Sequence, residues 1–315
     1  MSKQTWTVTE TEAETRLDKW LAAAGRLGSR AKALNAIERG KVFVNKAEQS
    51  AADAGRRMQA RDVVMLWMDR PGSAERRYAE RHDSGLHLLY EDTALLVINK
   101  PAGLLTVPLP AQPNEESLFD LVKHHLRSHA RREPLIVHRI DRDTSGLVIF
   151  AKHGAAQQRL KDLFERREAV RTYVAVVHGA PKPASGTWRN WLVWNQETLR
   201  QEQAERRTKD AKEAVCHYRV LEQWKDAALI EVRLETGKRN QIRVQAGLRG
   251  NPLVGEKQYL YDNSPTRKIA FPRQALHAQK LAFRHPVTNR QLSFEAPLPE
   301  DLEGLLRRLR ATSRA

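Results

Sequence analysis

The chain has 315 residues, with 54 Lys and Arg against 38 Asp and Glu, so its formal net charge is +16. Its 41% hydrophobic content and single cysteine indicate a globular protein of about two domains and exclude a disulfide scaffold or a cysteine-rich zinc site. No apolar run reaches the ~20 residues that cross a bilayer and no signal-peptide pattern is present, so a cytoplasmic protein without membrane contact is expected. The positive charge favours a polyanionic partner, because Lys and Arg release counterions from phosphates on binding.

Residues 14–70 predict a small α+β module. Apolar residues recur at helical spacing in its first half, Gly28 ends the first helix, and Ser29 can cap the second. The predicted elements are helices over 15–27 and 30–40 and strands over 41–45 and 62–68.

The second predicted helix is strongly basic. Arg30, Lys32 and Arg39 crowd it, and we expect all three to be exposed and to contact RNA phosphates; the alternative is an ordinary solvated helix face. The segments RLDKWL, SRAKALNAIERGKVFVN and RDVV resemble the S4 RNA-binding domain. That resemblance implies a module that docks on structured RNA.

A polar linker is expected over 71–84, followed by a larger domain over 85–305. Its strand-like runs follow one another with few helices between them, which favours an α+β fold over a doubly wound sheet. We expect a mixed, mostly antiparallel central sheet, with residues 189–213 forming a surface strand and a polar excursion. The predicted strands cover 86–92, 94–100, 146–152, 172–179, 215–224 and 227–237, and the predicted helices cover 117–130, 155–168 and 239–250.

A charged cluster, HRIDRDTSG at residues 138–146, stands directly before an apolar strand. Charge at the mouth of a buried strand is costly unless it is paired. The cluster could be a salt-bridged turn. It could equally hold a carboxylate ionised beside an arginine for nucleophilic or acid–base work.

The segment HRIDRDTSGLVIFAK resembles the signature of the RluA family of pseudouridine synthases. Four further segments resemble family motifs in the same order, at residues 99–107, 171–179, 234–245 and 273–288. The resemblance implies the pseudouridine synthase fold and an isomerase that acts on RNA. In this family an S4-like module commonly precedes the catalytic domain, as the resemblance implies here.

The resemblance assigns roles to individual residues. Asp141 matches the essential aspartate, and Arg243 matches the arginine that pairs with it. Arg139 matches the arginine linked to flipping and positioning of the target. Tyr173 matches the tyrosine that stacks on uracil or assists proton removal from C5, and Ile242 matches an apolar wall of the pocket.

Three positions depart from the family pattern. Arg239-Asn240 replaces the usual Thr-His, Gln245 stands where a histidine is frequent, and Gly255-Glu256 replaces Gly-Asp. The departures put RNA contacts and substrate identity in question more than the chemistry.

Pseudouridine formation breaks the N1–C1′ bond, turns the base and joins C5 to C1′. The reaction needs neither redox chemistry nor an energy source, so we expect no cofactor and no metal. The aspartate either attacks C1′ or takes the C2′ proton. The expected substrate is structured RNA, with ribosomal RNA of the large subunit first and tRNA second, and the expected state is a monomer.

Two other functions stay open. The protein could be a catalytically inactive RNA-binding or ribosome-associated member of the family. It could also be a sugar-processing enzyme that uses Asp141 and Asp143 as a carboxylate pair, although a charge of +16 suits a neutral sugar poorly.

Overall fold

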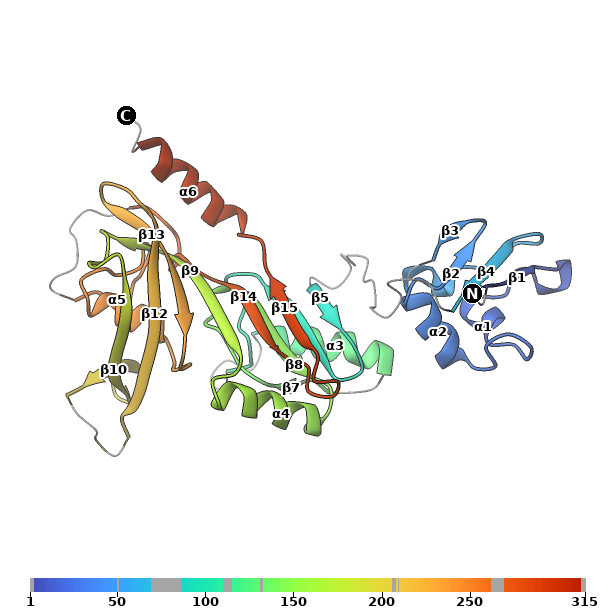
Figure 1. The fold of residues 1–315 in the computed structure, drawn as a ribbon, viewed down its shortest axis with the longest axis horizontal. Helices are drawn as coiled ribbons and strands as arrows, with labels where there is room; N and C mark the ends of the chain where they lie inside the picture. The colour runs from blue at the N-terminus through green and yellow to red at the C-terminus, as the bar shows by residue number, and fades with distance from the viewer. Residues whose placement is uncertain are drawn as a thin grey trace. The chain divides into compact units, whose positions relative to one another are not determined.

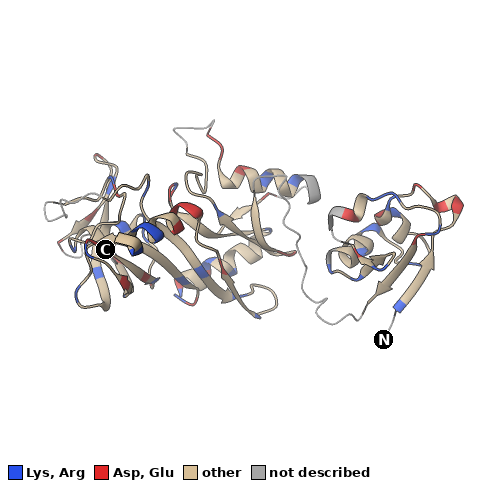
Figure 2. Ribbon diagram, turned by 90° about the horizontal axis from the view of Figure 1, so that it is seen from above, with Lys and Arg blue, Asp and Glu red and all other residues tan. Residues whose placement is uncertain are grey.

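The computed structural model describes residues 3–49, 51–68, 86–109, 115–130, 133–205, 208, 210–261 and 269–312. The chain divides into two compact units, one mostly within residues 1–83 and the other mostly within residues 93–315 (Figure 1). The predicted linker over 71–84 lies outside the described residues. Figure 2 shows Lys and Arg on the elements of both units.

The smaller unit is an antiparallel sheet with two helices. Its strands lie in the order β1-β4-β2-β3. Leu17, Trp20 and Ile37 are buried in its core. The elements are β1 (Lys3–Thr7), η1 (Glu10–Glu12), α1 (Leu17–Leu21), α2 (Arg30–Glu38), β2 (Val42–Val44), β3 (Ala47–Glu48), η2 (Ala51–Gly55) and β4 (Val63–Trp67).

Local signals explain both helices of this unit. The hydroxyl of Ser29 accepts a hydrogen bond from the N–H of Lys32 at 3.2 Å, which confirms the predicted cap of α2. The first helix is shorter than predicted and ends at Leu21. Gly25 and Gly28 take φ values of +88° and +71°, a conformation that a helix cannot contain.

The larger unit is an 11-stranded sheet in the order β11-β10-β12-β13-β9-β14-β8-β6-β5, with β15 on β14 and β7 on β8. Strands β14 and β8 run parallel, whereas neighbours such as β9–β13 and β10–β12 run antiparallel. The fold is therefore α+β with a mixed, mostly antiparallel sheet, as predicted. Its strands are β5 (His87–Glu91), β6 (Leu95–Lys100), β7 (Leu135–Ile136), β8 (Ser145–Ala151), β9 (Val170–His178), β10 (Ser185–Asn195), β11 (Arg200–Ala204), β12 (Lys212–Gln223), β13 (Ala227–Leu234), β14 (Leu276–Arg284) and β15 (Gln291–Glu295).

Four helices accompany this sheet in the described residues. They are α3 (Leu118–Ala130), α4 (Gly154–Glu165), α5 (Gln241–Gly247) and α6 (Glu300–Thr312). Leu302, Leu305 and Leu306 of α6 share a buried cluster with Val176 of β9. Within the described residues, no helix has the length and apolar character that a membrane span requires.

Strand β8 is buried along its whole length, which agrees with its continuous apolar run. Gly146 makes the close approach of β8 to β14 possible. A Cβ atom there would lie 2.3 Å from the carbonyl oxygen of Ala278, and the φ of +115° favours glycine as well. This close packing fixes the start of β8 against β14, and it thereby positions the end of the loop that precedes β8.

The region 189–213 is more regular than predicted. Much of it forms β10, β11 and the start of β12, so the prediction of a polar excursion is wrong for these segments. Trp188 is 3% exposed and stacks on Tyr218 with ring centroids 4.6 Å apart. Backbone pairing along the sheet edge provides the order that the polar side chains do not signal.

Candidate active site

A cavity of about 640 Å³ opens where the loop before β8, the ends of β9 and β13, and the start of α5 meet. All five residues that the sequence assigned to substrate or catalysis line it. These residues are Arg139, Asp141, Tyr173, Ile242 and Arg243. They come from three segments, the outer two of which lie about a hundred residues apart, and the sheet order brings them together.

The loop that carries Asp141 is held through its backbone carbonyls. The buried ammonium of Lys100 donates to the carbonyl of Arg142 at 2.8 Å, and to those of Pro101 and Leu104 at 2.7 Å. The hydroxyl of Thr106 donates to the carbonyl of Ile140 at 2.7 Å. These contacts on both sides of Asp141 fix its backbone without using its carboxylate.

A second set of contacts ties the same loop to α6. The guanidinium of Arg273 donates to the carbonyl of Asp143 at 2.9 Å and forms two hydrogen bonds with the carboxylate of Asp301. Asp143 is not among the residues that line the cavity. A turn closed by the N–H of Thr144 on the carbonyl of Asp141 separates the two aspartates. The cavity thus does not present them as a pair.

His138, the first residue of the charged cluster, has a structural position. Its Nε2 accepts a hydrogen bond from the N–H of Ile149 at 3.1 Å, and its ring stacks on Phe164 at 4.8 Å. Desolvation, followed by the nearby Arg171, lowers the pKa of His138 to about 3. The ring is neutral at physiological pH and anchors the loop to β8.

The carboxylate of Asp141 faces a cation that is shared with a second carboxylate. Nη1 of Arg243 lies 3.3 Å from Oδ2 of Asp141, whereas Nε and Nη2 donate to Glu256 at 2.7 and 2.8 Å. The Glu256 side chain is fully buried, and that of Asp141 is 25% exposed. Burial opposes the charge of Arg243, but Glu256 and Asp141 outweigh it and raise its pKa. Arg243 is therefore a fixed cation beside Asp141.

Glu256, which stands where the family pattern has an aspartate, has further partners besides Arg243. Glu256 also accepts hydrogen bonds from the backbone N–H groups of Gln258 at 2.9 Å and Tyr259 at 3.3 Å. Burial raises the pKa of its carboxyl, but the guanidinium of Arg243 and these N–H groups reverse the shift and lower it. The preceding Gly255 is required, because a Cβ atom there would lie 1.9 Å from the carbonyl oxygen of Arg273.

Asn240 is a site residue that the sequence did not assign. It precedes α5 in a left-handed conformation, with φ of +52°. Oriented to satisfy both neighbours, its amide nitrogen donates to the two carboxylate oxygens of Asp141 at 3.0 and 3.2 Å. Its oxygen then accepts from the hydroxyl of Tyr259 at 2.8 Å. The only signal in the sequence was the departure from the family's histidine at this position.

The apolar and aromatic side of the cavity comes from β9 and α5. Tyr173 is 7% exposed and Ile242 is 4% exposed. Burial raises the pKa of the Tyr173 phenol, and the charge of Asp141 adds to the rise. The phenol is therefore protonated at neutral pH. Arg139 is exposed and lines the cavity, and it forms no ion pair with another described residue.

The predicted RNA-contact residues of the smaller unit differ from one another. Arg30 is about half exposed, but its Nε and Nη2 contact the buried carboxylate of Asp18 at 2.8 and 2.7 Å. Arg39 is partly buried, and its Nε is inaccessible. The expectation of three freely exposed cations is thus wrong for Arg39 and incomplete for Arg30. Lys32 is exposed as predicted.

Other polar residues have structural positions. Cys216 is fully buried as expected, and burial raises the pKa of its thiol to about 12. The amide of Gln245 is also buried and donates to Trp188, Asn190 and Ala214 at 3.1 Å. The described residues contain no cluster of three or more His, Cys, Asp or Glu side chains arranged to hold a metal ion.

Comparison with known proteins identifies the family of the chain. Residues 94–247 match the RNA pseudouridylate synthase family, and residues 15–50 match the S4 domain. The chain is 37% identical to the "Uncharacterized RNA pseudouridine synthase YlyB" of Bacillus subtilis, with 96% of this chain and 97% of the relative covered. It belongs to the RluA family of RNA pseudouridine synthases.

Other relatives of this RNA pseudouridine synthase carry a more specific name. "Ribosomal large subunit pseudouridine synthase D" of Zymomonas mobilis is 33% identical, with 98% of each chain covered. A protein of the same name from Buchnera aphidicola is 35% identical over 70% of this chain and 72% of its own. The solved structure of human RNA pseudouridylate synthase domain containing 4 shares the fold. Its TM-score is 0.59 at 24% identity, and 71% of this chain and 92% of that chain are covered.

Proposed function

We propose that Asp141 catalyses the isomerisation of uridines in large-subunit ribosomal RNA, with the target base bound in the cavity. The observation that carries this proposal is the geometry of the carboxylate. Asp141 is partly exposed in a cavity of about 640 Å³, and Arg243 and Asn240 hold it from one side. A carboxylate fixed in this way can meet a sugar carbon that develops positive charge.

The reaction conserves atoms and electrons. The N1–C1′ bond breaks, the detached uracil turns, C5 bonds to C1′, and the proton lost from C5 is balanced by the proton gained at N1. Asp141 serves either as a nucleophile at C1′ or as the base for the C2′ proton. In both cases the guanidinium of Arg243, 3.3 Å from Oδ2 of Asp141, supplies a positive charge beside the carboxylate.

The remaining residues fit the handling of a flipped base. Tyr173 and Ile242 offer apolar surface for a uracil that leaves its stack, a step that costs a few kcal/mol. The raised pKa of Tyr173 supports stacking or hydrogen bonding over direct removal of the C5 proton. Arg139 lines the cavity. From there it can fill the gap that the flipped base leaves in the RNA stack, or guide the base into the cavity.

Ribosomal RNA is favoured over tRNA by the names of the relatives, several of which are large-subunit pseudouridine synthases. The S4 domain supplies a second RNA-binding surface. An inactive binding protein is disfavoured, because Asp141, Tyr173 and Arg243 are all present and meet in one cavity.

The chemical assignment is tested by comparing Asp141→Asn with Asp143→Asn. We expect the first variant to lose tritium release from RNA labelled at uridine C5, at least about a thousandfold, while RNA binding persists. The second variant should keep substantial activity, because Asp143 lies outside the cavity. Equal losses in both variants, or an active Asp141→Asn protein, would exclude the assignment.

The substrate assignment is tested by mapping pseudouridine in cellular RNA with and without the gene, and after complementation with the Asp141→Asn variant. Loss of sites in large-subunit ribosomal RNA, restored only by the wild-type gene, is expected. Loss of sites only in tRNA would contradict it.

A further inference from the structure

Arg171 is a buried cation that forms no ion pair within the part of the chain that the structure describes. It lies on β9 and is 8% exposed, yet its Nε is buried without a hydrogen-bond partner. Among the described residues its guanidinium forms no ion pair, and its nearest assigned contact is the ring of Phe164 at 5.1 Å. Burial lowers the pKa of Arg171. A buried charge of this kind is costly unless a ligand compensates it.

Arg171 lines the same cavity as Asp141. It stands two residues before Tyr173 on β9, and residues at this spacing share one face of a strand. Tyr173 and Asp141 line this cavity as well. The unpartnered guanidinium is therefore next to the space proposed for the uracil.

The neighbourhood of Arg171 is cationic. Lys212, Lys238 and Arg167 line the same part of the cavity. Burial lowers the pKa of Lys238, and the charges of Lys212, Arg167 and Arg171 lower it further. Lys212 and Lys238 form no ion pair with another described residue.

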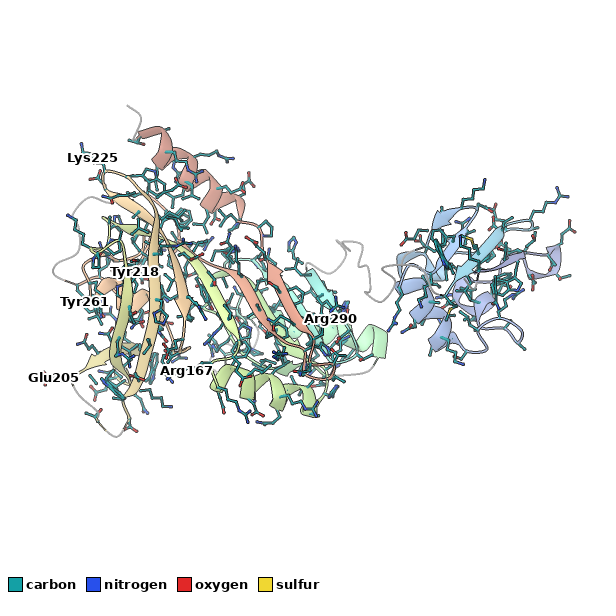
Figure 3. The ribbon with its side chains drawn as sticks, in the orientation of Figure 1. Arg167, Glu205, Tyr218, Lys225, Tyr261 and Arg290 are labelled. Atoms are coloured by element: carbon teal, nitrogen blue, oxygen red, sulfur yellow. The ribbon has the colours of Figure 1, made fainter. Side chains whose placement is uncertain are left out.

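Two of the acidic residues nearby are already engaged elsewhere. Arg167 contacts Glu235 closely and Glu213 at 3.7 Å. Glu165 also lines the cavity, but no ion pair joins it to Arg171. Figure 3 places Arg167 at the end of the sheet opposite Lys225, which follows β12.

The backbone is shaped to admit the guanidinium. Gly237 follows β13, and a Cβ atom on it would lie 2.3 Å from Nη1 of Arg171. Any larger residue at 237 would displace the group. The guanidinium of Arg171 therefore packs against the backbone of Gly237, and both residues line the cavity.

We infer that Arg171, with Lys212 and Lys238, forms a phosphate subsite that binds an RNA backbone phosphate adjoining the target uridine. This inference rests on the proposed function, because it takes the cavity as the site of that uridine. A phosphate supplies the negative charge that the buried guanidinium lacks, and a guanidinium can bind it through two N–H groups.

The test measures binding of uridine 3′,5′-bisphosphate and of uridine to the full-length protein by calorimetry. The variants are Arg171→Met, Arg171→Lys and the control Lys225→Met, which removes an exposed cation at the far end of the sheet. We expect Arg171→Met to weaken bisphosphate binding at least tenfold and to leave uridine binding unchanged. Arg171→Lys should recover part of the loss, and Lys225→Met should match wild type.

Thermal unfolding separates binding from a structural role. Removing an unpaired buried charge should leave the melting temperature of Arg171→Met equal to or above that of wild type. The bisphosphate should raise the melting temperature of wild type and not of this variant. Should Arg171→Met fail to fold, the Lys212→Met/Lys238→Met double variant replaces it, with the same expected loss of bisphosphate binding.

Several outcomes would overturn the subsite. One is that the wild-type protein does not bind the bisphosphate, and another is that the variants bind it as tightly as wild type. A third is that Arg171→Met weakens uridine binding as much as bisphosphate binding, which would assign Arg171 to the base. Tritium release that depends on Asp141 tests the proposed function separately and does not involve this subsite.

Discussion

Two aspartates, one in each unit, lie beside arginines and yet have different environments. Asp18 of the smaller unit is fully buried and accepts hydrogen bonds from Arg16 at 3.2 Å and from Arg30 at 2.8 Å. Asp141 is 25% exposed, and Arg243 reaches it with a single nitrogen at 3.3 Å. The difference follows from a third group, Glu256, which takes the other guanidinium nitrogens of Arg243.

The comparison shows how the partners of an arginine decide how much of a neighbouring carboxylate stays accessible. Arg16 and Arg30 use the lone pairs of Asp18 fully, so Asp18 joins the helices and can do little else. The cation beside Asp141 is held mainly by Glu256 and reaches a single oxygen of the carboxylate. The neutral amide of Asn240 donates to both oxygens, and the side chain of Asp141 is still 25% exposed. Residue types alone do not distinguish the two cases.

The largest test of this comparison is Glu256→Gln. Without the second charge, the guanidinium of Arg243 should turn toward Asp141 and cover it as Arg16 and Arg30 cover Asp18. We expect kcat to fall about a hundredfold, which corresponds to about 2.7 kcal/mol. Because a buried pair loses one partner, the free energy of unfolding should fall by about 3 kcal/mol or more.

The matched control is Glu256→Asp, which restores the residue of the family pattern and should keep most of the activity. Single-turnover rates and urea unfolding measure both effects. Unchanged turnover in the Gln variant would show that Glu256 does not control the orientation of the Arg243 guanidinium.

The converse test is Asp18→Asn in the smaller unit. We expect a loss of about 1–3 kcal/mol of stability, because a buried acceptor of charged hydrogen bonds is weakened. The turnover at saturating RNA should not change. Hydrogen exchange of the α1 and α2 amides reports the stability, and the exposed Glu14→Gln, whose side chain is 72% exposed, is the control. A fall in kcat that accompanies the loss of stability would contradict the separation of Asp18 from the chemistry.

The same variant predicts a pH effect. Burial raises the pKa of Asp18, but Arg16 and Arg30 outweigh it and hold the pKa below its usual 3.8. A lowered folded-state pKa gives stability that is present above the unfolded value and is lost as the pH falls below it. The smaller unit of the wild type should therefore weaken below about pH 4, and the Asn variant should lack this part of the acid dependence.

A smaller effect is expected for Asn240→Gly, which removes the amide that holds Asp141 but tolerates the φ of +52°. We expect kcat to fall about tenfold, or about 1.4 kcal/mol, with little change in KM. Asn240→His, the residue of the family pattern, should recover activity. Asn289→Gly, at a φ of +57° away from the cavity, controls for the flexibility of glycine. A glycine variant with full activity would show that Arg243 alone positions Asp141.

The smallest effect concerns Lys32, the exposed cation of the predicted RNA face. Lys32→Met should reduce the slope of log affinity against log salt by roughly 0.7–0.9 if it contacts one phosphate. Stability should not change, because Lys32 contacts no carboxylate in the described chain. Filter binding across several salt concentrations measures the slope, and an unaltered slope would remove Lys32 from the RNA surface. Arg30 cannot serve here, since its loss would also release Asp18.

The sequence by itself predicted most of the elements and the candidate reacting residues. A continuous apolar run located β8, helical spacing of apolar residues located α2, and Ser29 marked the cap. The order of five motifs pointed to Asp141, Tyr173 and Arg243. These signals are local, because a strand pattern or a cap depends on residues within a few positions of one another. The motifs are also short enough to be recognised without their partners.

Only the tertiary structure decided how those residues are used. Arg243 and Asp141 are 102 positions apart, and Glu256, which shares Arg243, lies on another segment. Tertiary contacts likewise determine the environments of Asn240, Arg171 and Arg30, because no local sequence pattern predicts their neighbours. The strength of a charge contact depends on distance, burial and competing partners, and the packing of the sheet sets all three.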